Sequence, residues 1–547
     1  FEIKDAKFQY ENINFISKLI EIKKNENNFF NVKGDVDNPK TNINVGDLKK
    51  YFKNIPNNIL SDRVIIRSQN DFEFYIDKRF KIKDIKVRSK LNIEKILYKL
   101  SNKLFKEILN VNNNLEIFDT NLDITYETSS LKQNNIKLLS LNGNSYLFEN
   151  GQKDKIQYQL TNQENKVELI ANINIYSKPI LLNLINFEKK ENVNSSIKLK
   201  LTSNKNRSIL LNKIFFKSKN DEIYLEDLRI KSNNQIENFK KIELNFTDKS
   251  NLQNNLVVKA QKKNYLVTGS KFNASKIIDH SLKVNSKNNL FVSDNNNIFK
   301  INIEKVYIDK KNYIKNLKGD IGFKNNKLNT ANLISFFPNG EKFELNINET
   351  QNNEIVTQIF TRYPKPIVQR YKFIDGFDEG VLNFQSVKKD NISNSVLIID
   401  NFKVKKVPVL AKILTLASLQ GIADTLTGEG IRFTDFEMKF NVNDGFMKIE
   451  EIYAIGPAIS LMMEGYIDKK NLVSLRGTLV PATTINRTIS SIPVLGDILV
   501  GNKVGEGVFG VSFKIKGQGK DLKTSVNPIK TLAPRFITRI LDKLKKK

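Results

Sequence analysis

The feature that most constrains this chain is a two-residue alternation of apolar and polar side chains, which recurs along most of its length. Leu122, Ile124 and Tyr126 alternate with acidic and hydroxyl neighbours, and the pattern returns at 197–201, 299–304 and 343–348. Successive side chains of a strand point to opposite faces of its sheet, so this period predicts strands with one apolar and one polar face. The chain is therefore predicted to be mostly β.

The clearest predicted hairpin lies between residues 436 and 449. An alternating stretch ends at Asn443-Asp444-Gly445, a turn signal, and a second stretch with Met447 and Ile449 follows. Asp-Gly between two alternating runs is typical of a tight two-residue hairpin turn. The alternation is cleanest over residues 509–515.

A weak internal similarity also runs through the chain. A glycine step after apolar residues, followed by a short polar segment, occurs in the stretches that begin at Val32, Val267, Leu317 and Met463. Similar hairpins added side by side bury their apolar faces against their neighbours. The predicted fold is an elongated, curved antiparallel sheet, folded into an open hydrophobic groove and carrying a few amphipathic helices, chiefly near the C-terminus.

Helical periodicity is confined to a few segments. Apolar residues at three- and four-residue spacing predict an amphipathic helix near 92–110, with further helices near 408–427, 483–500 and 534–546. The last of these is basic on one side, and either docks on the final strands or contacts a membrane surface. Its membrane-surface candidates are Arg535, Phe536, Arg539, Ile540, Lys543 and Leu544.

The best transmembrane candidate is the stretch 407–426, but Lys412, Gln420 and Asp424 interrupt it. A spanning helix needs about 20 predominantly apolar residues, so we expect this one to pack on protein or to lie against lipid. The sequence begins at Phe1 with no signal-like segment, and we expect the true N-terminus, with a membrane anchor, to lie upstream.

The composition narrows the range of partners. With 88 Lys and Arg against 59 Asp and Glu, the formal net charge is +29, which favours anionic partners such as nucleic acid or a phospholipid surface. The lysines are scattered among many asparagines and isoleucines, as codon bias in an AT-rich genome produces, so a solvated basic surface explains much of the charge. No helix-turn-helix, zinc-finger or ribonucleoprotein motif is present, and no nucleic-acid partner is expected.

No constellation for catalysis stands out. The sole histidine, His280, has only sequence neighbours as partners, and Gly505, Gly507 and Gly510 precede an alternating strand where a dinucleotide-binding loop would open a helix. The chain has 0 cysteines, which excludes disulfides, thiolate zinc sites and thiol nucleophiles. We expect that the protein is not an enzyme and that it has no catalytic residues, no cofactor and no bound metal.

The region from about 375 to 539 resembles the C-terminal part of the AsmA-like family, in the YhdP-like subgroup of large envelope proteins. Matching elements follow one another in order: DGFDEGVLNF, NFKVKKVPVLAKILTLASLQGIADTLTGEGIRF, GPAISLMMEGYID, GTLVPATTINRTISSIPVLGDIL, GEGVFGVSFKIKG and VNPIKTLAP. The resemblance implies a boundary between repeated β-groove segments at 1–374 and a C-terminal region at 375–547. It also implies a relationship to bridge-like lipid transport proteins.

For function, the resemblance implies phospholipid transport from the inner membrane across the bacterial periplasm toward the outer membrane, with possible envelope protein partners. Lipid would diffuse along the groove. The groove candidates are Phe436, Met438, Phe440, Phe509, Val511, Phe513, Ile515, Leu410, Leu414, Leu419 and Ile422. The alternatives are an ordinary closed core in a structural envelope-maintenance protein, or a basic nucleic-acid-binding protein without lipid conduction.

Overall fold

The computed structural model describes residues 1–547 except 11–12, 26–28, 48–56, 101–105, 107–113, 130–135, 148–153, 164–165, 205–208, 232–235, 263, 282–295, 325–326, 372–375, 406, 417–418, 482–509, 519–520 and 530–547. By internal contacts the chain divides into two units. Unit 1 comprises Phe1–Ile277 with Leu290–Asn295, and unit 2 comprises Ile278–Asn289 with Asn296–Lys547. The expected boundary at 374 lies inside unit 2.

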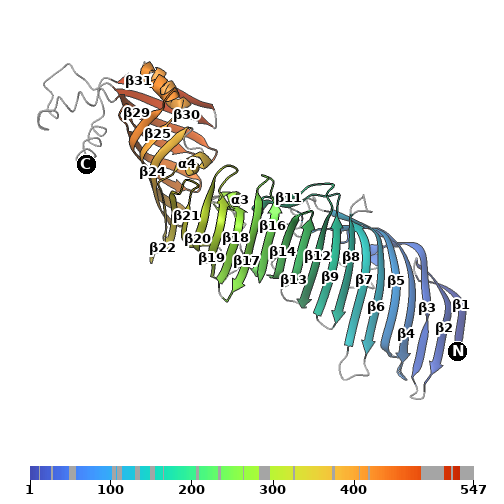
Figure 1. The fold of residues 1–547 in the computed structure, drawn as a ribbon. Coiled ribbons are helices and arrows are strands. Elements are labelled where there is room, and N and C mark those ends of the chain that lie inside the picture. The colour runs from blue at the N-terminus through green and yellow to red at the C-terminus, as the bar shows by residue number, and fades with distance from the viewer. Residues whose placement is uncertain are drawn as a thin grey trace, which may run out of the picture. The chain divides into compact units, whose positions relative to one another are not determined.

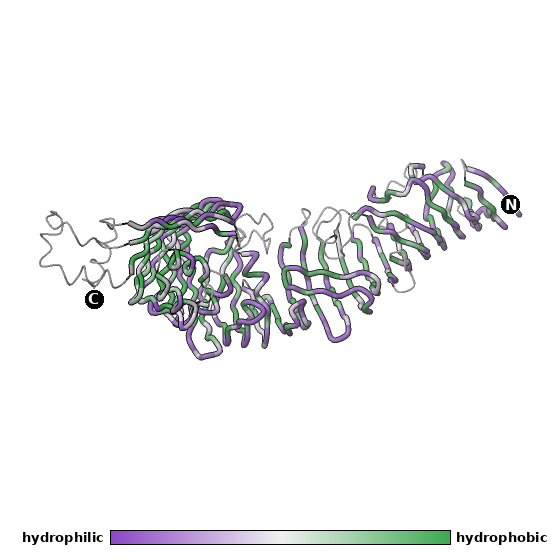
Figure 2. The backbone as a smooth tube through the Cα atoms, turned by 90° about the horizontal axis from the view of Figure 1, so that it is seen from above, coloured by the Kyte–Doolittle hydropathy of each residue, from purple (hydrophilic) through white to green (hydrophobic). Residues whose placement is uncertain are grey.

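The prediction of a mostly β fold is confirmed. Twenty-nine of the described strands are assigned to one sheet, and two short strands form a separate hairpin. Most strands pair with their nearest neighbours along the chain, and the paired strands run antiparallel (Figure 1). Hydrophilic and hydrophobic residues alternate along the strands (Figure 2), as the two-residue period requires.

Unit 1 is a succession of antiparallel hairpins in which β9 also pairs with β12, and β14 with β16. Its elements are β1 (Glu2–Tyr10), β2 (Ile13–Lys24), β3 (Phe30–Asn44), β4 (Arg63–Ile76), β5 (Ile82–Lys99), β6 (Asn114–Ser129), β7 (Ile136–Leu147), β8 (Lys155–Gln163), β9 (Lys166–Ile175), β10 (Ile180–Leu182), η1 (Asn183–Ile185), β11 (Phe187–Lys189), β12 (Ser195–Asn204), β13 (Ile209–Ser218), β14 (Asp221–Ile230), β15 (Ile236–Asn238), β16 (Lys241–Thr247), β17 (Gln253–Gln261) and β18 (Asn264–Asn273). The helix α3 (Ser275–Ser281) follows, and the division between the two units falls within it.

Unit 2 continues the same plan of antiparallel hairpins and adds the three short helices α4, α5 and α6. Its elements are β19 (Asn297–Tyr307), β20 (Tyr313–Lys324), β21 (Lys327–Phe336), β22 (Lys342–Glu349), β23 (Ile355–Thr361), α4 (Lys365–Tyr371), β24 (Phe377–Lys389), β25 (Ile392–Val404), α5 (Pro408–Leu416), α6 (Gln420–Thr427), β26 (Ile431–Asn443), β27 (Phe446–Ile455), β28 (Ile459–Ile467), β29 (Leu472–Pro481), β30 (Gly510–Gln518) and β31 (Asp521–Ile529).

The helix expected near 92–110 is wrong in its first part. Residues 93–99 belong to β5, where Ile93 pairs with Thr120 and Ile96 with Ile117 of β6. The apolar spacing fits a helix, but the hydrogen-bonded neighbours on both sides of β5 override this local preference. Apart from residue 106, the part from 101 to 110 lies outside the described residues.

The hairpin expected at 443–445 is confirmed. Asn443 pairs with Phe446 across a two-residue turn, and both turn residues have positive φ, 49° for Asp444 and 81° for Gly445. This is the turn whose twist matches that of the flanking strands. The chain therefore enters β27 with Met447 and Ile449 on the same face as Val442 and Phe440.

Helices α5 and α6 lie within the range 408–427. Among the described residues, no helix has both the length and the apolar character needed to cross a membrane. The segments 483–500 and 534–546, where further helices are expected, fall outside the described residues.

Glycines mark places where the strand register shifts. Gly465 of β28 pairs with Ile449 next to a shift in β27, and a Cβ at Gly465 would stand 2.1 Å from the carbonyl oxygen of Ser474. Gly269 of β18 lies beside a shift opposite β17. Such bulges bend a strand and increase its twist. The repeated glycine step in the sequence thus corresponds to bends in the sheet.

Candidate functional site: two apolar sheet faces

One face of unit 1 carries an uninterrupted row of uncharged, mostly apolar residues that lie directly opposite one another from β5 to β18. This row, called row 1, consists of Leu91, Leu122, Gly143, Tyr158, Ala171, Leu199, Ile214, Leu225, Ile242, Val258 and Val267. Directly opposite residues share a face. Most of the row, including Leu199, Ile214 and Leu225, is half-buried and keeps contact with solvent.

Part of the opposite face of this sheet carries a row of charged residues. One residue along from row 1, a second row of directly opposite residues runs across β12 to β17: Lys200, Lys213, Glu226, Lys241 and Lys259. Alternation along each strand therefore places the charged and the apolar side chains of these two rows on opposite faces. The next row on the charged face also includes Phe215, Tyr224 and Val257, so that face is mixed, whereas row 1 itself is uncharged.

A short segment covers part of the unit 1 apolar face. This strap, Ile180–Lys189, comprises β10, η1 and β11, and its Phe187 is completely buried. The Phe187 ring makes edge-to-face contacts with Phe216 at 5.4 Å and Phe246 at 5.1 Å between ring centroids. The strap thus shields a second apolar row, next to row 1, that includes Phe216, Ile223 and Leu244.

A buried amine fixes the end of the strap. Lys189, 2% exposed, donates through Nζ to the carbonyl oxygens of Tyr176 at 2.9 Å and Lys178 at 2.6 Å. Burial lowers the pKa of Lys189, while the nearby Asp154 carboxylate acts in the opposite direction. Asp154 in turn accepts from the backbone N–H groups of Tyr176 and Ser177. These polar contacts compensate the cost of burying the two charges.

A small uncharged network lies at the margin of row 1. The hydroxyls of Thr120 and Ser145 are 3.0 Å apart, and the Ser145 hydroxyl is 3.3 Å from the Tyr158 hydroxyl. Burial raises the pKa of Tyr158, so its phenol stays neutral at physiological pH. The network satisfies buried hydroxyls without introducing charge on this face.

Unit 2 presents an apolar face of the same kind. Its first row consists of Leu382, Ile399, Phe436, Ala454, Leu461, Leu479 and Val511, and its second of Phe384, Leu397, Met438, Ile452, Met463, Gly477, Phe513 and Val526. The helices α5 and α6 pack into the same hydrophobic cluster, with Leu414 and Leu426 fully buried. The first row is mostly buried, and the second is half-buried at Phe384, Leu397, Met438 and Met463.

The structure places the predicted groove residues in two environments. Val511, Phe513, Ile515, Leu410 and Leu414 are buried, as in a closed core. Phe436, Met438, Phe440, Leu419 and Ile422 are half-buried and pack at the margin of that core. Phe509 and the membrane-surface candidates Arg535, Phe536, Arg539, Ile540, Lys543 and Leu544 lie outside the described residues.

The residues of row 1 and the strap were missed as site residues by the sequence reasoning. Row 1 had a signal, because the alternation at Leu122 and Leu199 predicts strands with one apolar face. The strap had none, since its three-residue strands are too short to show a period.

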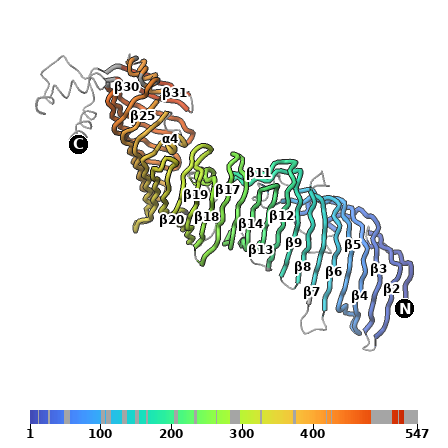
Figure 3. Tube along the Cα trace, viewed as in Figure 1, coloured from blue at the N-terminus to red at the C-terminus, as the bar shows by residue number. Residues whose placement is uncertain are grey.

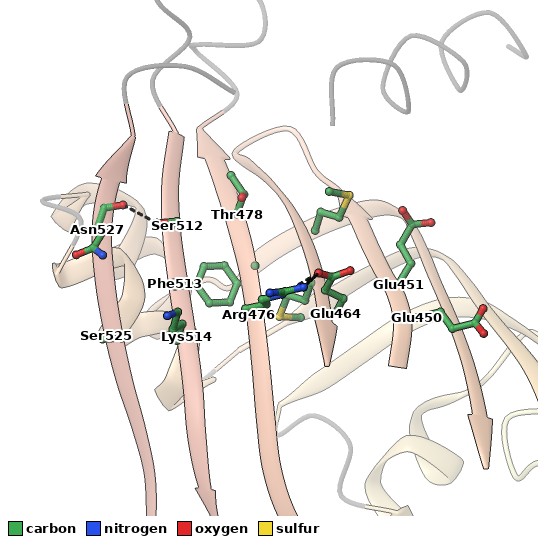
Figure 4. Close-up of a pocket in the computed structure, with 13 residues that line it drawn as sticks. Glu450, Glu451, Glu464, Arg476, Thr478, Ser512, Phe513, Lys514, Ser525 and Asn527 are labelled. Carbon is green, nitrogen blue, oxygen red and sulfur yellow. Dashed lines mark hydrogen bonds and ion pairs between the residues drawn. The ribbon is translucent and has the colours of Figure 1, made fainter. Parts of the chain in front are cut away.

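A shallow pocket of about 400 Å³ lies among β27 to β31 of unit 2. Figure 4 shows Arg476 and Glu464 directed toward each other there, with Nη2 of the arginine 2.7 Å from the carboxylate. Lys514 and Ser512 also line the pocket. The lining holds no histidine or cysteine, and across the described residues no group of three or more His, Cys, Asp or Glu side chains is placed to hold a metal ion.

No protein-family model matches this chain, and a search of curated proteins finds no significant match. The structure itself defines the class: a large, nearly all-β protein whose strands are mostly assigned to one sheet. Its distinguishing surface feature is the pair of apolar faces, one in each unit.

Proposed function

We propose that this protein carries phospholipids across the bacterial cell envelope by holding their acyl chains on the apolar sheet faces. The observation that supports this most is row 1 of unit 1, a mostly half-buried, uncharged row that crosses β5 to β18, with a row of charged residues on the opposite face of β12 to β17. A closed core would bury such a row, whereas a lipid-carrying surface leaves it accessible to hydrocarbon.

The energetic advantage is large. Exposing a lipid with about 30 methylenes to water costs on the order of 25 kcal/mol, at about 0.8 kcal/mol per methylene. An apolar strand face removes much of this cost without needing a specific side chain. Charged headgroups remain in water at the margin, so the same surface accepts different phospholipids.

The resemblance of residues 375–539 to the AsmA-like family supports the same proposal and adds the location. In that family's arrangement, the protein is anchored in the inner membrane and conducts phospholipid through the periplasm toward the outer membrane. We extend this to the present chain, with both membrane surfaces as its partners and with no catalytic step.

Site-specific photocrosslinking tests the proposal with matched pairs of neighbouring residues. A photoreactive phenylalanine at Ile214 or Phe440 lies on an apolar face, and one at Lys213 or Lys439 lies one residue away on the opposite face. We expect phospholipid adducts, identified by mass spectrometry, at Ile214 and Phe440 but not at Lys213 and Lys439. Adducts at none of the four positions, or equally at all four, would contradict the proposal.

A structural protein with closed cores is the second candidate, favoured by the full burial of Leu479, Val511 and Leu414 in unit 2. In that case the protein purifies without stoichiometric phospholipid, and none of the four positions crosslinks to lipid. Lipid extraction and mass spectrometry of the purified chain distinguish the two candidates.

A further inference from the structure

The turn between β4 and β5 has a residue that its backbone geometry disfavours. Asp77 accepts hydrogen bonds from the backbone N–H groups of Arg79 and Lys81, both at 2.9 Å, and the Phe80 N–H donates to the Asp77 carbonyl oxygen at 2.9 Å. Phe80 has φ of 56°, in the left-handed region. A bulky side chain is rare in this conformation, which glycine and asparagine adopt more readily.

Five other turns in the described chain share this hydrogen-bond pattern and show what the position normally takes. In each, the fourth residue donates its N–H to the carbonyl oxygen of the first and has positive φ. That residue is Asn186 (57°), Asn251 (59°), Gly340 (88°), Asn353 (57°) or Asn471 (61°). Among the described residues, this turn therefore takes asparagine or glycine wherever it serves only to connect two strands. Phe80 is the exception.

Packing does not explain the exception, because the Phe80 side chain is 87% exposed. Two further apolar residues stand at the same end of the sheet: Ile82 is 56% exposed and Phe30 is 40% exposed. Phe30 lies directly opposite Ile76, and Ile76 opposite Ile82, so all three share one face. We call Phe30, Lys24 and residues 77–82 the Phe80 tip; β2 to β5, which carry it, lie side by side (Figure 3).

The Phe80 tip is also basic. Lys24, Lys78, Arg79 and Lys81 are exposed, and none of them forms an ion pair within the described part of the chain. Asp77, the acidic residue of the turn, has its pKa lowered by the backbone hydrogen bond from Lys81 and by further contacts with Arg79 and Lys83. That carboxylate is therefore engaged within the turn, and exposed cationic residues flank Phe80 along the chain on both sides.

We propose that the Phe80 tip docks on the surface of an anionic phospholipid bilayer. Exposed aromatic and aliphatic side chains enter the interface between headgroups and acyl chains, while lysine and arginine attract anionic headgroups. A nucleic acid would use the charges but gains little from Ile82 and Phe30, which lie on a sheet face. The docking rests on the turn geometry and the charge, and holds whether or not the apolar faces carry lipid.

The first experiment measures binding of the full chain to phosphatidylcholine vesicles with and without phosphatidylglycerol, by sedimentation. Phe80→Asn gives this turn the residue found in its counterparts. We expect partition to the anionic vesicles to fall on the order of tenfold, and the midpoint of thermal unfolding to stay unchanged or rise. If Phe80→Asn binds anionic vesicles as well as the unaltered chain does, the proposal is overturned, whichever way the unfolding midpoint moves.

A second experiment locates the contact directly. The chain has 0 cysteines, so Phe80→Cys and, as a matched control, Asn471→Cys each accept a single polarity-sensitive fluorophore. We expect a blue shift on anionic vesicles for the label at 80, reversed by high salt, and none for the label at 471. No shift at 80, or equal shifts at both positions, refutes docking through this tip. Lipid crosslinking at Ile214 and Phe440 is scored separately, so the two proposals can fail independently.

Discussion

Replacing Phe187 with alanine tests how the strap is held on the unit 1 apolar face. The ring is 0% exposed and contacts Phe216 and Phe246 edge to face, with centroids 5.4 and 5.1 Å away. Truncating a buried phenylalanine typically costs about 3 to 5 kcal/mol. Because β10 and β11 have three residues each and pair only with each other, we expect this loss to fall on the strap and not on the whole unit.

Hydrogen exchange read by mass spectrometry provides the assay. A local loss of about 3 kcal/mol corresponds to more than a hundredfold faster exchange of strap amides, because each 1.4 kcal/mol is a factor of about ten. Leu184→Ala, at a residue of the same strap that is 36% exposed, is the control and should change exchange only slightly. Equal loss of protection in β12 to β17, or no change in the strap, would refute this account.

Three further predictions follow from single contacts. Lys365 donates to Asp378 at 3.0 Å and lowers the pKa of that carboxyl below its ordinary value of 3.8. The stabilisation from this contact is therefore present above pH 3.8 and is lost as the pH falls below it. Lys365→Met should flatten this part of a plot of urea midpoint against pH. Gly465→Ala places a Cβ 2.1 Å from the Ser474 carbonyl oxygen, at a residue whose φ is 150°. This substitution should lower the free energy of unfolding by about 1 to 3 kcal/mol. An unchanged urea midpoint would contradict the close approach. Asn471→Phe recreates the Phe80 turn elsewhere and should destabilise by about 1 kcal/mol in the same assay, whereas Phe80→Asn is expected to leave the stability unchanged or to raise it.

The strand pattern was predictable because it depends on local alternation. At Leu122, Leu199 and Phe440 each apolar side chain alternates with a polar one, and each lies on the predicted side of its strand. The segment at 93–99 was not predictable in the same way. Its apolar spacing fits a helix, and only pairing with β6, a contact distant in sequence, makes it a strand.

The sequence predicts apolar strand faces as the candidate site, but it does not show which strands carry an accessible face. Sequence reasoning selected residues from the C-terminal region, and several of these, such as Leu414 and Val511, are buried by contacts between helix and sheet that no local pattern reveals. The accessible row of unit 1 depends on the register of many strand pairs, which a period of two does not define. Phe80 was overlooked because its significance appears only when its turn is compared with others.

The register of strand pairing keeps these faces apolar, because the chain carries many charged residues next to the apolar ones. With a formal charge of +29, a one-residue slip of β13 would bring Lys213 onto the face now occupied by Ile214. Bulges held by specific contacts oppose such slips: Asp35 accepts the N–H groups of Lys18 and Leu19, both at 2.9 Å, beside the shifted register of β2. A surface for hydrocarbon needs no particular side chain, but it must exclude charge. The sequence is therefore free to vary among apolar residues on one face and among polar residues on the other, while the glycines and carboxylates that define the register are constrained.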